Sequence, residues 1–405
     1  MSMCPTEYWL WLQCALGAGA KTDELLAYFG DPEKMYNAGS NEWRLSGLMT
    51  NKKINALKSI SPSETGVIFR ECKAKGYSII TPDSVNYPER FKQLSDMPLV
   101  LYAMGDASVL KDAVSIGVVG TRDASNYGIE TAQKLSFSLA SCGVTIVSGG
   151  ALGIDSEAHA GAMLAKGRTA AFLGCGLSYD YLKENASLRR AITKYGAVIS
   201  EYAPFTPASR TTFPIRNRLI SGLTLGTLVI EAGIKSGSLI TANYALEQGK
   251  DVFAVPGDIV RSSFDGANHL IKNGAKPVFS AMDILSEYEY LYRDLIDFSK
   301  ANVSLSEIPY VEYRKKAQKE ASQKPVLKKK NEKVQEKVIV KEKKELDDSF
   351  SSEAKKVYSV LNENPTHIDD ILRQTSLKMS DVLSALTELE LMGDVKQTEG
   401  KKYSI

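Results

Sequence analysis

The chain has 405 residues, of which 43% are hydrophobic, enough to bury more than one core and to form about two to four domains. Its 50 basic and 48 acidic residues nearly cancel to a net charge of +2, so a site for a polyanion must be local. There is no apolar run of about 18 residues and no signal-peptide pattern, which argues against a membrane or secreted protein and predicts a cytoplasmic location.

The first segment, residues 1–65, is predicted to form a small helical domain of the SAM or helix-hairpin-helix type. Apolar residues such as Leu25, Leu26 and Phe29 recur there at helical spacing. The stretch 46–57 is similar to a DNA-binding helix-hairpin-helix, but Met49 stands where that motif has its second glycine. An ordinary loop between two helices is therefore the favoured interpretation of this stretch.

Residues 66–295 are predicted to form an extended Rossmann-like domain, an α/β fold around a parallel sheet. Two short β-rich runs between 76 and 106 would extend the sheet at its edge. Farther on, short apolar runs alternate with helical stretches, as in a parallel sheet covered by helices on both faces. These runs lie at 115–119, 144–148, 169–173, 197–200, 227–231 and 251–255.

A charged flexible linker is predicted for residues 296–348, because most of this segment is rich in charge and poor in apolar residues. Residues 349–405 then indicate three helices and a hairpin, the pattern of a winged-helix domain. The expected recognition helix, 379–392, carries Asp381, Glu388 and Glu390 and no basic residue. A protein-contact or regulatory role is favoured for it over DNA reading.

The turns after the apolar runs should meet at the carboxyl edge of the sheet, where ligands of open α/β sheets bind. Glycines and hydroxyl groups dominate these turns, and such turns expose backbone N–H groups at helix N-termini, which favours phosphate. The candidate residues of these turns are Gly120, Thr121, Arg122, Ser148, Gly149, Gly150, Lys235, Ser236, Gly237 and Ser238.

Two arginines, Arg216 and Arg218, fall in the first turn of a helix that is predicted to begin near Pro214. Positive charge there opposes the helix dipole, so an external anion that bridges the two guanidinium groups would explain their presence. The alternative is an ion pair with an acid of the same crevice, such as Glu201 or Glu231. That alternative is favoured for a single arginine, but not for Arg122, Arg216 and Arg218 together.

The glycine-rich turns do not fit a dinucleotide cofactor, which needs G-x-G-x-x-G and an acidic residue about 20 positions later. Arg122 stands at the second glycine position of the first turn, and the second turn reads GGALG. Residues 233–238 also lack the Gly-Lys-Ser/Thr of a P-loop. Five cysteines without CxxC spacing and only three histidines make a metal site or a histidine-based triad improbable. We therefore expect no cofactor, no metal and no catalytic residues.

Five ordered stretches resemble the DNA-processing protein A family (DprA/Smf). The stretches are GVVGTR (117–122), VSGGALGIDSEAHAGAM (147–163), FPIRNRLISGL (213–223), EAGIKSGSLITANYALEQGKDVFAVPG (231–257) and GANHLIKNGA (266–275). The resemblance covers nearly the whole chain. It implies a homodimer without enzymatic activity that binds single-stranded DNA and helps load RecA recombinase in natural transformation and homologous recombination.

Carried onto this sequence, the resemblance places the DNA pocket at Arg122, at the turn 148–150, and at Arg216 and Arg218. We add Asn217 and the other turn residues named above as phosphate-binding candidates. Phe213 is a candidate for stacking on a base, although packing is the commoner role of such a residue. Asp155 is expected to cap a helix that begins at Ser156.

Two other functions remain open at this point. The first is a nucleotide-processing enzyme similar to phosphoribohydrolases, which have a related Rossmann fold; their PGGxGTxxE stretch is absent here. The second is a sequence-specific regulator that acts through the winged helix, a role that the acidic recognition helix disfavours.

Overall fold

The computed structural model describes residues 4–60, 62–301, 303–311, 350–361, 366–375, 377, 379–391, 395–398 and 402–404. It divides the chain into two units, residues 1–325 and 326–405, which are treated separately. In the described part of the chain, no helix is both long enough and apolar enough to cross a membrane.

The N-terminal part of the first unit is helical and has its own apolar core. Trp11, Trp43 and Leu10 are buried in this core, and the rings of the two tryptophans lie 5.7 Å apart. Local sequence begins the helices: Asp31 caps the third helix by accepting a hydrogen bond from the Lys34 N–H at 2.8 Å. The helices are α1 (Pro5–Leu16), α2 (Asp23–Phe29), α3 (Pro32–Leu45), α4 (Asn51–Ser59) and α5 (Pro62–Lys75).

The predicted domain boundary at residue 65 falls inside α5. The helix continues past that point because Cys72 is buried in the same core as Trp9 and Trp11. The boundary between the helical part and the sheet therefore lies after Lys75, and the first strand begins at Ser78.

The described strands of the first unit form one nine-stranded sheet in the order β1-β2-β6-β5-β4-β3-β7-β8-β9. Strand β1 pairs antiparallel with β2, and β2 pairs antiparallel with β6. All other neighbouring strands of this sheet are parallel. The strands are β1 (Ser78–Ile80), β2 (Leu101–Gly105), β3 (Ser115–Val119), β4 (Thr145–Ser148), β5 (Thr169–Leu173), β6 (Gly196–Ser200), β7 (Gly226–Val229), β8 (Asp251–Ala254) and β9 (Lys276–Pro277). The predicted Rossmann-like sheet is confirmed, including its edge extension.

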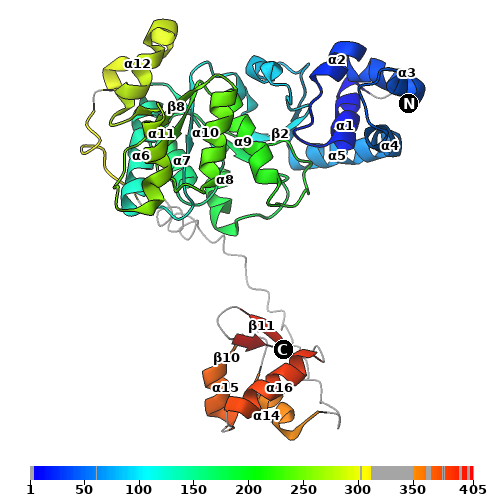
Figure 1. The fold of residues 1–405 in the computed structure, drawn as a ribbon, viewed down its shortest axis with the longest axis vertical. Helices are drawn as coiled ribbons and strands as arrows, with labels where there is room; N and C mark the ends of the chain where they lie inside the picture. The colour runs from blue at the N-terminus through cyan, green and yellow to red at the C-terminus, as the bar shows by residue number, and fades with distance from the viewer. Residues whose placement is uncertain are drawn as a thin grey trace, which may run out of the picture. The chain divides into compact units, whose positions relative to one another are not determined.

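Helices cover both faces of this sheet (Figure 1). Side chains of α9, α10 and α11 share one core with the strands, and those of α6, α7 and α12 share the other. The strand order reverses around β3: the chain passes from β3 through β4 and β5 to β6 on one side, and later returns to place β7 on the other side. Ligands of open α/β sheets bind at such a switch point.

The helices on the sheet are α6 (Asn126–Ser141), α7 (Ile154–Leu164), α8 (Ala186–Ile192), α9 (Thr212–Leu223), α10 (Gly237–Glu247), α11 (Asp265–Lys272) and α12 (Ala281–Tyr292). Short 3-10 turns are η1 (Glu89–Gln93), η2 (Ala107–Lys111), η3 (Lys183–Asn185), η4 (Ser262–Phe264), η5 (Arg293–Leu295) and η6 (Phe298–Lys300).

The described start of the predicted linker is folded as part of the first unit. Ile296 and Ala301 are buried in the core beneath α6 and α12, and Ile308 is also buried. We call the described segment 296–311, without residue 302, the strap. The Val311 N–H donates to the side-chain oxygen of Gln133 at 2.8 Å, which connects the strap to α6. The linker therefore begins later than residue 296; residues 302 and 312–348, the remainder of the prediction, lie outside the described residues.

The second unit confirms the predicted winged-helix domain. Helices α14 (Ser352–Val360), α15 (Ile368–Thr375) and α16 (Met379–Leu391) pack beside a sheet of β10 (Thr366–His367), β12 (Lys402–Ser404) and β11 (Lys396–Thr398). Val357, Ile371 and Leu389 are fully buried in its core. Glu388 of the expected recognition helix accepts a hydrogen bond from the Ser351 hydroxyl at 2.6 Å, so this acid helps to anchor the start of α14.

Candidate nucleic-acid interface

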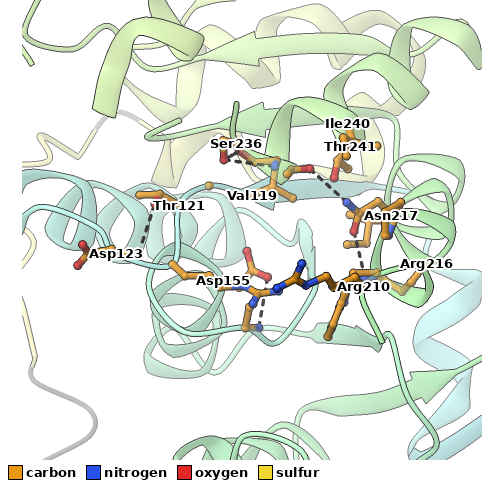
Figure 2. A pocket seen from close by; sticks show the side chains of 18 residues that line it. Val119, Thr121, Asp123, Asp155, Arg210, Arg216, Asn217, Ser236, Ile240 and Thr241 are labelled. Atoms are coloured by element: carbon orange, nitrogen blue, oxygen red, sulfur yellow. Dashed lines mark hydrogen bonds between the residues drawn. The ribbon is translucent and has the colours of Figure 1, made fainter. Parts of the chain in front are cut away.

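A cavity of about 550 Å³ lies at the switch point, between the turn after β3 and the N-terminal ends of α9 and α10. Figure 2 shows Asp155, Arg210 and Arg216 along one side of it, with Ser236, Ile240 and Thr241 along the other. The predicted site residues that line the cavity are Gly120, Thr121, Arg122, Arg216, Asn217, Ser236, Gly237 and Ser238. The structure thus brings together three segments that are far apart in the sequence.

The turn after β3 is held by close backbone packing. A Cβ on Gly120 would lie 2.5 Å from Cγ1 of Ile154, so only glycine fits there. The Thr121 N–H donates to the carbonyl of Glu231 at 2.7 Å. The Glu231 carboxylate accepts from both the N–H and the hydroxyl of Ser125, at 3.0 and 2.8 Å. Glu231 therefore supports the turn, with no ion pair to Arg216 or Arg218 among the described contacts.

The N-terminus of α10 faces the cavity with its hydroxyl groups. Ser236 is the N-cap and accepts from the Ser238 N–H at 3.4 Å, and the two hydroxyl oxygens are 2.7 Å apart. The N-cap of α10 is thus Ser236, two residues before Ser238. Asn217 donates to the Gly237 carbonyl at 3.3 Å and ties α9 to this helix. The helix terminus supplies positive potential to the cavity.

Arg216 forms the floor of the cavity and is 5% exposed. Its Nη1 donates to the Gly149 carbonyl at 2.7 Å and also to the carbonyl of Phe172. Its Nε donates to the Asn217 side-chain oxygen at 3.1 Å. Burial lowers the pKa of the Arg216 guanidinium, and the neighbouring Asp155 carboxylate opposes that shift. The arginine is consequently fixed in place, with little freedom to follow a ligand.

The turn 148–150 supports this arginine and does not line the cavity. A Cβ on Gly149 would lie 2.6 Å from the Arg216 Nη1, so the glycine makes room for the guanidinium. The Ser148 hydroxyl is buried and donates to the Val118 carbonyl at 2.6 Å. The carbonyl of Gly150, which has a φ of +65°, accepts from Asn185. Direct phosphate contact by these three residues stays a prediction, and their placement indicates a supporting role.

Asp155 lies beside Arg216 and lines the cavity. The expectation that it caps its helix is wrong: α7 begins at Ile154, Gly153 is the N-cap residue, and Asp155 stands in the first turn. Its carboxylate accepts from the Ala151 N–H at 3.3 Å. Burial raises the pKa of the Asp155 carboxyl, and the Arg216 guanidinium opposes this shift. The pair places a carboxylate in a cavity that otherwise favours anions.

The mouth of the cavity combines exposed positive charge with an aromatic ring. The Arg122 guanidinium carbon lies 5.1 Å from the centroid of the Phe213 ring, and that of Arg216 lies 6.0 Å from it. Exposed Arg210 also lines the cavity. Sequence reasoning missed Arg210 because it precedes α9 and follows no strand directly. Its only signal was its position three residues before Phe213.

Arg218 does not face the cavity. It is 1% exposed, and its Nη2 donates to both carboxylate oxygens of Glu201, at 2.7 and 2.8 Å. Its Nε lies 3.2 Å from a carboxylate oxygen of Asp96. The ion-pair alternative therefore describes Arg218, and its predicted phosphate contact is not supported by this placement. Lys235 is exposed and does not line the cavity, so its phosphate contact stays a prediction.

His159 is fully buried in α7, and its Nδ1 lies 2.7 Å from the Thr169 hydroxyl. Burial, with a contribution from the positive charge of Arg216, lowers the pKa of His159 to about 3. An unfolded chain protonates this imidazole below about pH 6.5, the usual pKa of histidine.

Acid should therefore destabilise the protein through His159. Between about pH 6.5 and the folded pKa, the unfolded state binds a proton that the folded state excludes, so this part of the free energy of unfolding falls by about 1.4 kcal/mol per pH unit. Denaturant unfolding of wild type and His159→Gln at pH 7 and pH 5 isolates the contribution. We expect the wild type to lose about 2 kcal/mol more than the variant. Equal losses would show that His159 takes up a proton in the folded state.

The sequence model described as DNA recombination-mediator protein A matches residues 78–289. That range is more than half of the chain and contains every residue that lines the cavity. The chain belongs to this family. The model described as the DprA winged helix domain matches residues 341–401, in agreement with the fold of the second unit.

Relatives of the recombination-mediator family agree with the assignment. The DNA processing protein DprA of Bacillus subtilis is 42% identical over 215 residues, which cover 53% of this chain and 72% of that protein. The protein Smf of Synechocystis is 33% identical over 358 residues, or 88% of this chain and 86% of that protein. The X-ray structure of DNA processing protein A from Streptococcus pneumoniae covers 71% of this chain and 99% of its own, with 32% identity and a TM-score of 0.61.

Proposed function

We propose that this family member binds single-stranded DNA at the cavity between β3, α9 and α10. The observation that carries the proposal is that Arg122, Arg210 and Arg216 line one cavity together with Phe213 and the N-terminus of α10, and that Arg122 and Arg216 lie near the Phe213 ring. Guanidinium groups and helix N–H groups suit phosphate oxygens, and an aromatic ring suits a nucleobase. We also infer from the family that two copies act as a homodimer and that the bound strand is passed to RecA in natural transformation and homologous recombination.

A single strand fits this mixture of groups better than a duplex does. Phosphate contacts supply affinity to either form of DNA, but only unpaired bases expose their faces to stacking. Phe213 is only half-buried and keeps part of its surface open, while its neighbours Arg122 and Arg216 provide the charge.

We further infer that the site binds its ligand without converting it. Of the residues that line the cavity, Asp123 and Asp155 are the acids. Asp155 is buried beside Arg216, and Asp123 is exposed at the mouth, with its N–H donating to the Thr121 hydroxyl. The nucleotide-processing alternative predicts release of free base from nucleoside monophosphates, which an assay of the purified protein detects directly.

The test of the proposal is a titration with labelled single-stranded and duplex oligonucleotides at several salt concentrations. We expect tighter binding of the single strand, with an affinity that falls as salt rises. Arg122→Ala should weaken binding about tenfold, since one charge-assisted phosphate contact and one cation near the stacking ring are lost. It should also reduce the slope of log K against log salt by about 0.7, the value for one phosphate on a single strand.

Arg293→Ala is the matched control, because Arg293 is also exposed but does not line the cavity. It should bind like the wild type. Equal affinity for duplex and single strand, or an Arg122→Ala variant that binds like Arg293→Ala, would sink the assignment of the cavity.

A further inference from the structure

We propose that the N-terminal helical part belongs to the DNA site as a positioning element. Its loop of residues 17–22, which joins α1 to α2, holds α9 through the buried Arg218–Glu201 ion pair. That contact fixes the position of α9, and with it Arg216 and Phe213 at the cavity. The inference rests on the proposed DNA site and assigns to Arg218 a positioning role in place of a phosphate contact.

The first observation is that Glu201 is bound from two directions. Its carboxylate accepts from Arg218 on α9 and also from the backbone N–H of Gly19 in the loop, at 3.2 Å. Its backbone carbonyl accepts from the side chain of Gln13 on α1, also at 3.2 Å. Both Arg218 and Glu201 are 1% exposed, so water does not compete for these bonds. One buried acid thus joins α9 to the N-terminal helices.

The second observation is a direct steric contact between the loop and α9. A Cβ on Gly19 would lie 2.8 Å from Cγ2 of Ile215, which is the residue next to Arg216. Gly19 has a φ of +73°, a conformation that glycine adopts without strain. The loop backbone therefore rests on α9 with no space for a larger residue.

The third observation is a second, indirect link between the loop and α9. The Thr22 N–H donates to the carbonyl of Ser95 at 3.2 Å, and the adjacent Asp96 lies 3.2 Å from the Arg218 Nε. The end of the loop is thus fixed beside the same guanidinium group. The loop therefore meets α9 directly at Ile215, and the loop and α1 reach Arg218 indirectly through Glu201 and through the segment of Ser95 and Asp96.

These contacts reach the cavity because α9 is a single helix of 12 residues that carries Ile215, Arg216 and Arg218. Residues two positions apart on a helix point about 200° away from each other. Arg216 therefore faces the cavity while Arg218 faces the N-terminal loop. A rotation or shift of α9 that loosened Arg218 would also displace the Arg216 guanidinium from the carbonyls of Gly149 and Phe172.

The test compares Gly19→Ala with Gly17→Ala in the full-length protein. Both glycines have positive φ, but a Cβ on Gly17 meets nothing within 4 Å, so the two variants share the backbone strain and differ in the push on Ile215. We expect Gly19→Ala to raise the Kd for a single-stranded oligonucleotide about tenfold and Gly17→Ala to change it less than about twofold. Binding is measured well below the melting temperature of each variant.

The salt dependence separates positioning from loss of a phosphate contact. Because Gly19→Ala removes no charge, its slope of log K against log salt should equal that of the wild type, whereas Arg122→Ala should reduce the slope. A merely structural role would lower the melting temperature of both glycine variants and leave both affinities unchanged. Gln13→Leu removes the bond to the Glu201 carbonyl without strain and should weaken binding in the same direction if Gly19→Ala does not fold.

The possible outcomes are distinct. The positioning role would be overturned if Gly19→Ala and Gln13→Leu both bound like the wild type while Arg122→Ala bound weakly. That result would leave the proposed DNA site intact. If the wild type itself fails to bind, or Arg122→Ala has no effect, the proposed function fails first. A reduced salt slope in Gly19→Ala would also contradict the proposal, because it would indicate a lost phosphate contact.

Discussion

Arg216→Ala is expected to lower the free energy of unfolding by about 3–5 kcal/mol, the loss typical when a buried charge is left without the opposite charge that compensates it. The substitution leaves the Asp155 carboxylate in the interior, at 7% exposure, without its neighbouring cation. It also removes the donor to the carbonyls of Gly149 and Phe172. Urea unfolding followed by circular dichroism measures the change, and the folded fraction should bind single-stranded DNA weakly.

Two comparisons make this result specific to the buried position. Arg122→Ala, at the exposed mouth of the same cavity, should change the free energy of unfolding by less than about 0.5 kcal/mol. The double variant Arg216→Ala, Asp155→Ala should recover part of the loss, because it removes the uncompensated carboxylate. If the Arg216→Ala protein were as stable as the Arg122→Ala protein, the Arg216 guanidinium would not be held by the carbonyls of Gly149 and Phe172.

The sheet could be predicted from the sequence because its strands are buried on both faces. Runs such as 115–119 and 169–173 are continuously apolar, and they coincide with β3 and β5. The end of the domain was predicted less well. The strap after α12 is held by Ile296, Ala301 and Ile308, whose spacing follows no helical or strand period. Its packing depends on surfaces of α6 and α12 that only the folded chain provides.

The position of the site was predictable for a topological reason, and its individual contacts were not. Parallel strands bring their carboxyl ends to one edge, so the turn at 120–122 and the start of α10 had to meet there. Which of these turns line the cavity and which lie beneath it could not be predicted from the sequence. Ser148 and Gly149 end underneath Arg216 because β4 is followed by a turn that binds the arginine through a carbonyl. The identity of a residue does not show which of its backbone groups faces the ligand.

The helix phase explains the remaining difference. Arg216 and Arg218 are two residues apart, and about 100° per residue places them on nearly opposite sides of α9. The two side chains therefore had little chance of sharing one phosphate site once the segment was helical. The sequence left open which of the two would face the cavity, because that depends on how α9 packs on β5 and on the N-terminal loop.

A double-mutant cycle on Arg218 and Glu201 should show strong coupling. Among the described contacts, Glu201→Leu leaves buried Arg218 with the partly exposed Asp96 as its acidic partner, and Arg218→Met leaves the Glu201 carboxylate with the Gly19 N–H as its bonded donor. Each single variant should lose about 3–5 kcal/mol of the free energy of unfolding, because a buried charge stays behind. The double variant, which buries two apolar side chains of similar size, should be more stable than the sum of the two losses predicts, by about 2 kcal/mol or more.

The same variants decide between an ion pair and a phosphate contact for Arg218. If the guanidinium served DNA, Arg218→Met would reduce the slope of log K against log salt by about 0.7, and the double variant would do the same. Because Arg218 is 1% exposed and bound to Glu201 and Asp96, we expect the slope of the folded double variant to equal that of the wild type. Additive losses of stability together with a reduced slope would instead return Arg218 to the DNA-binding surface.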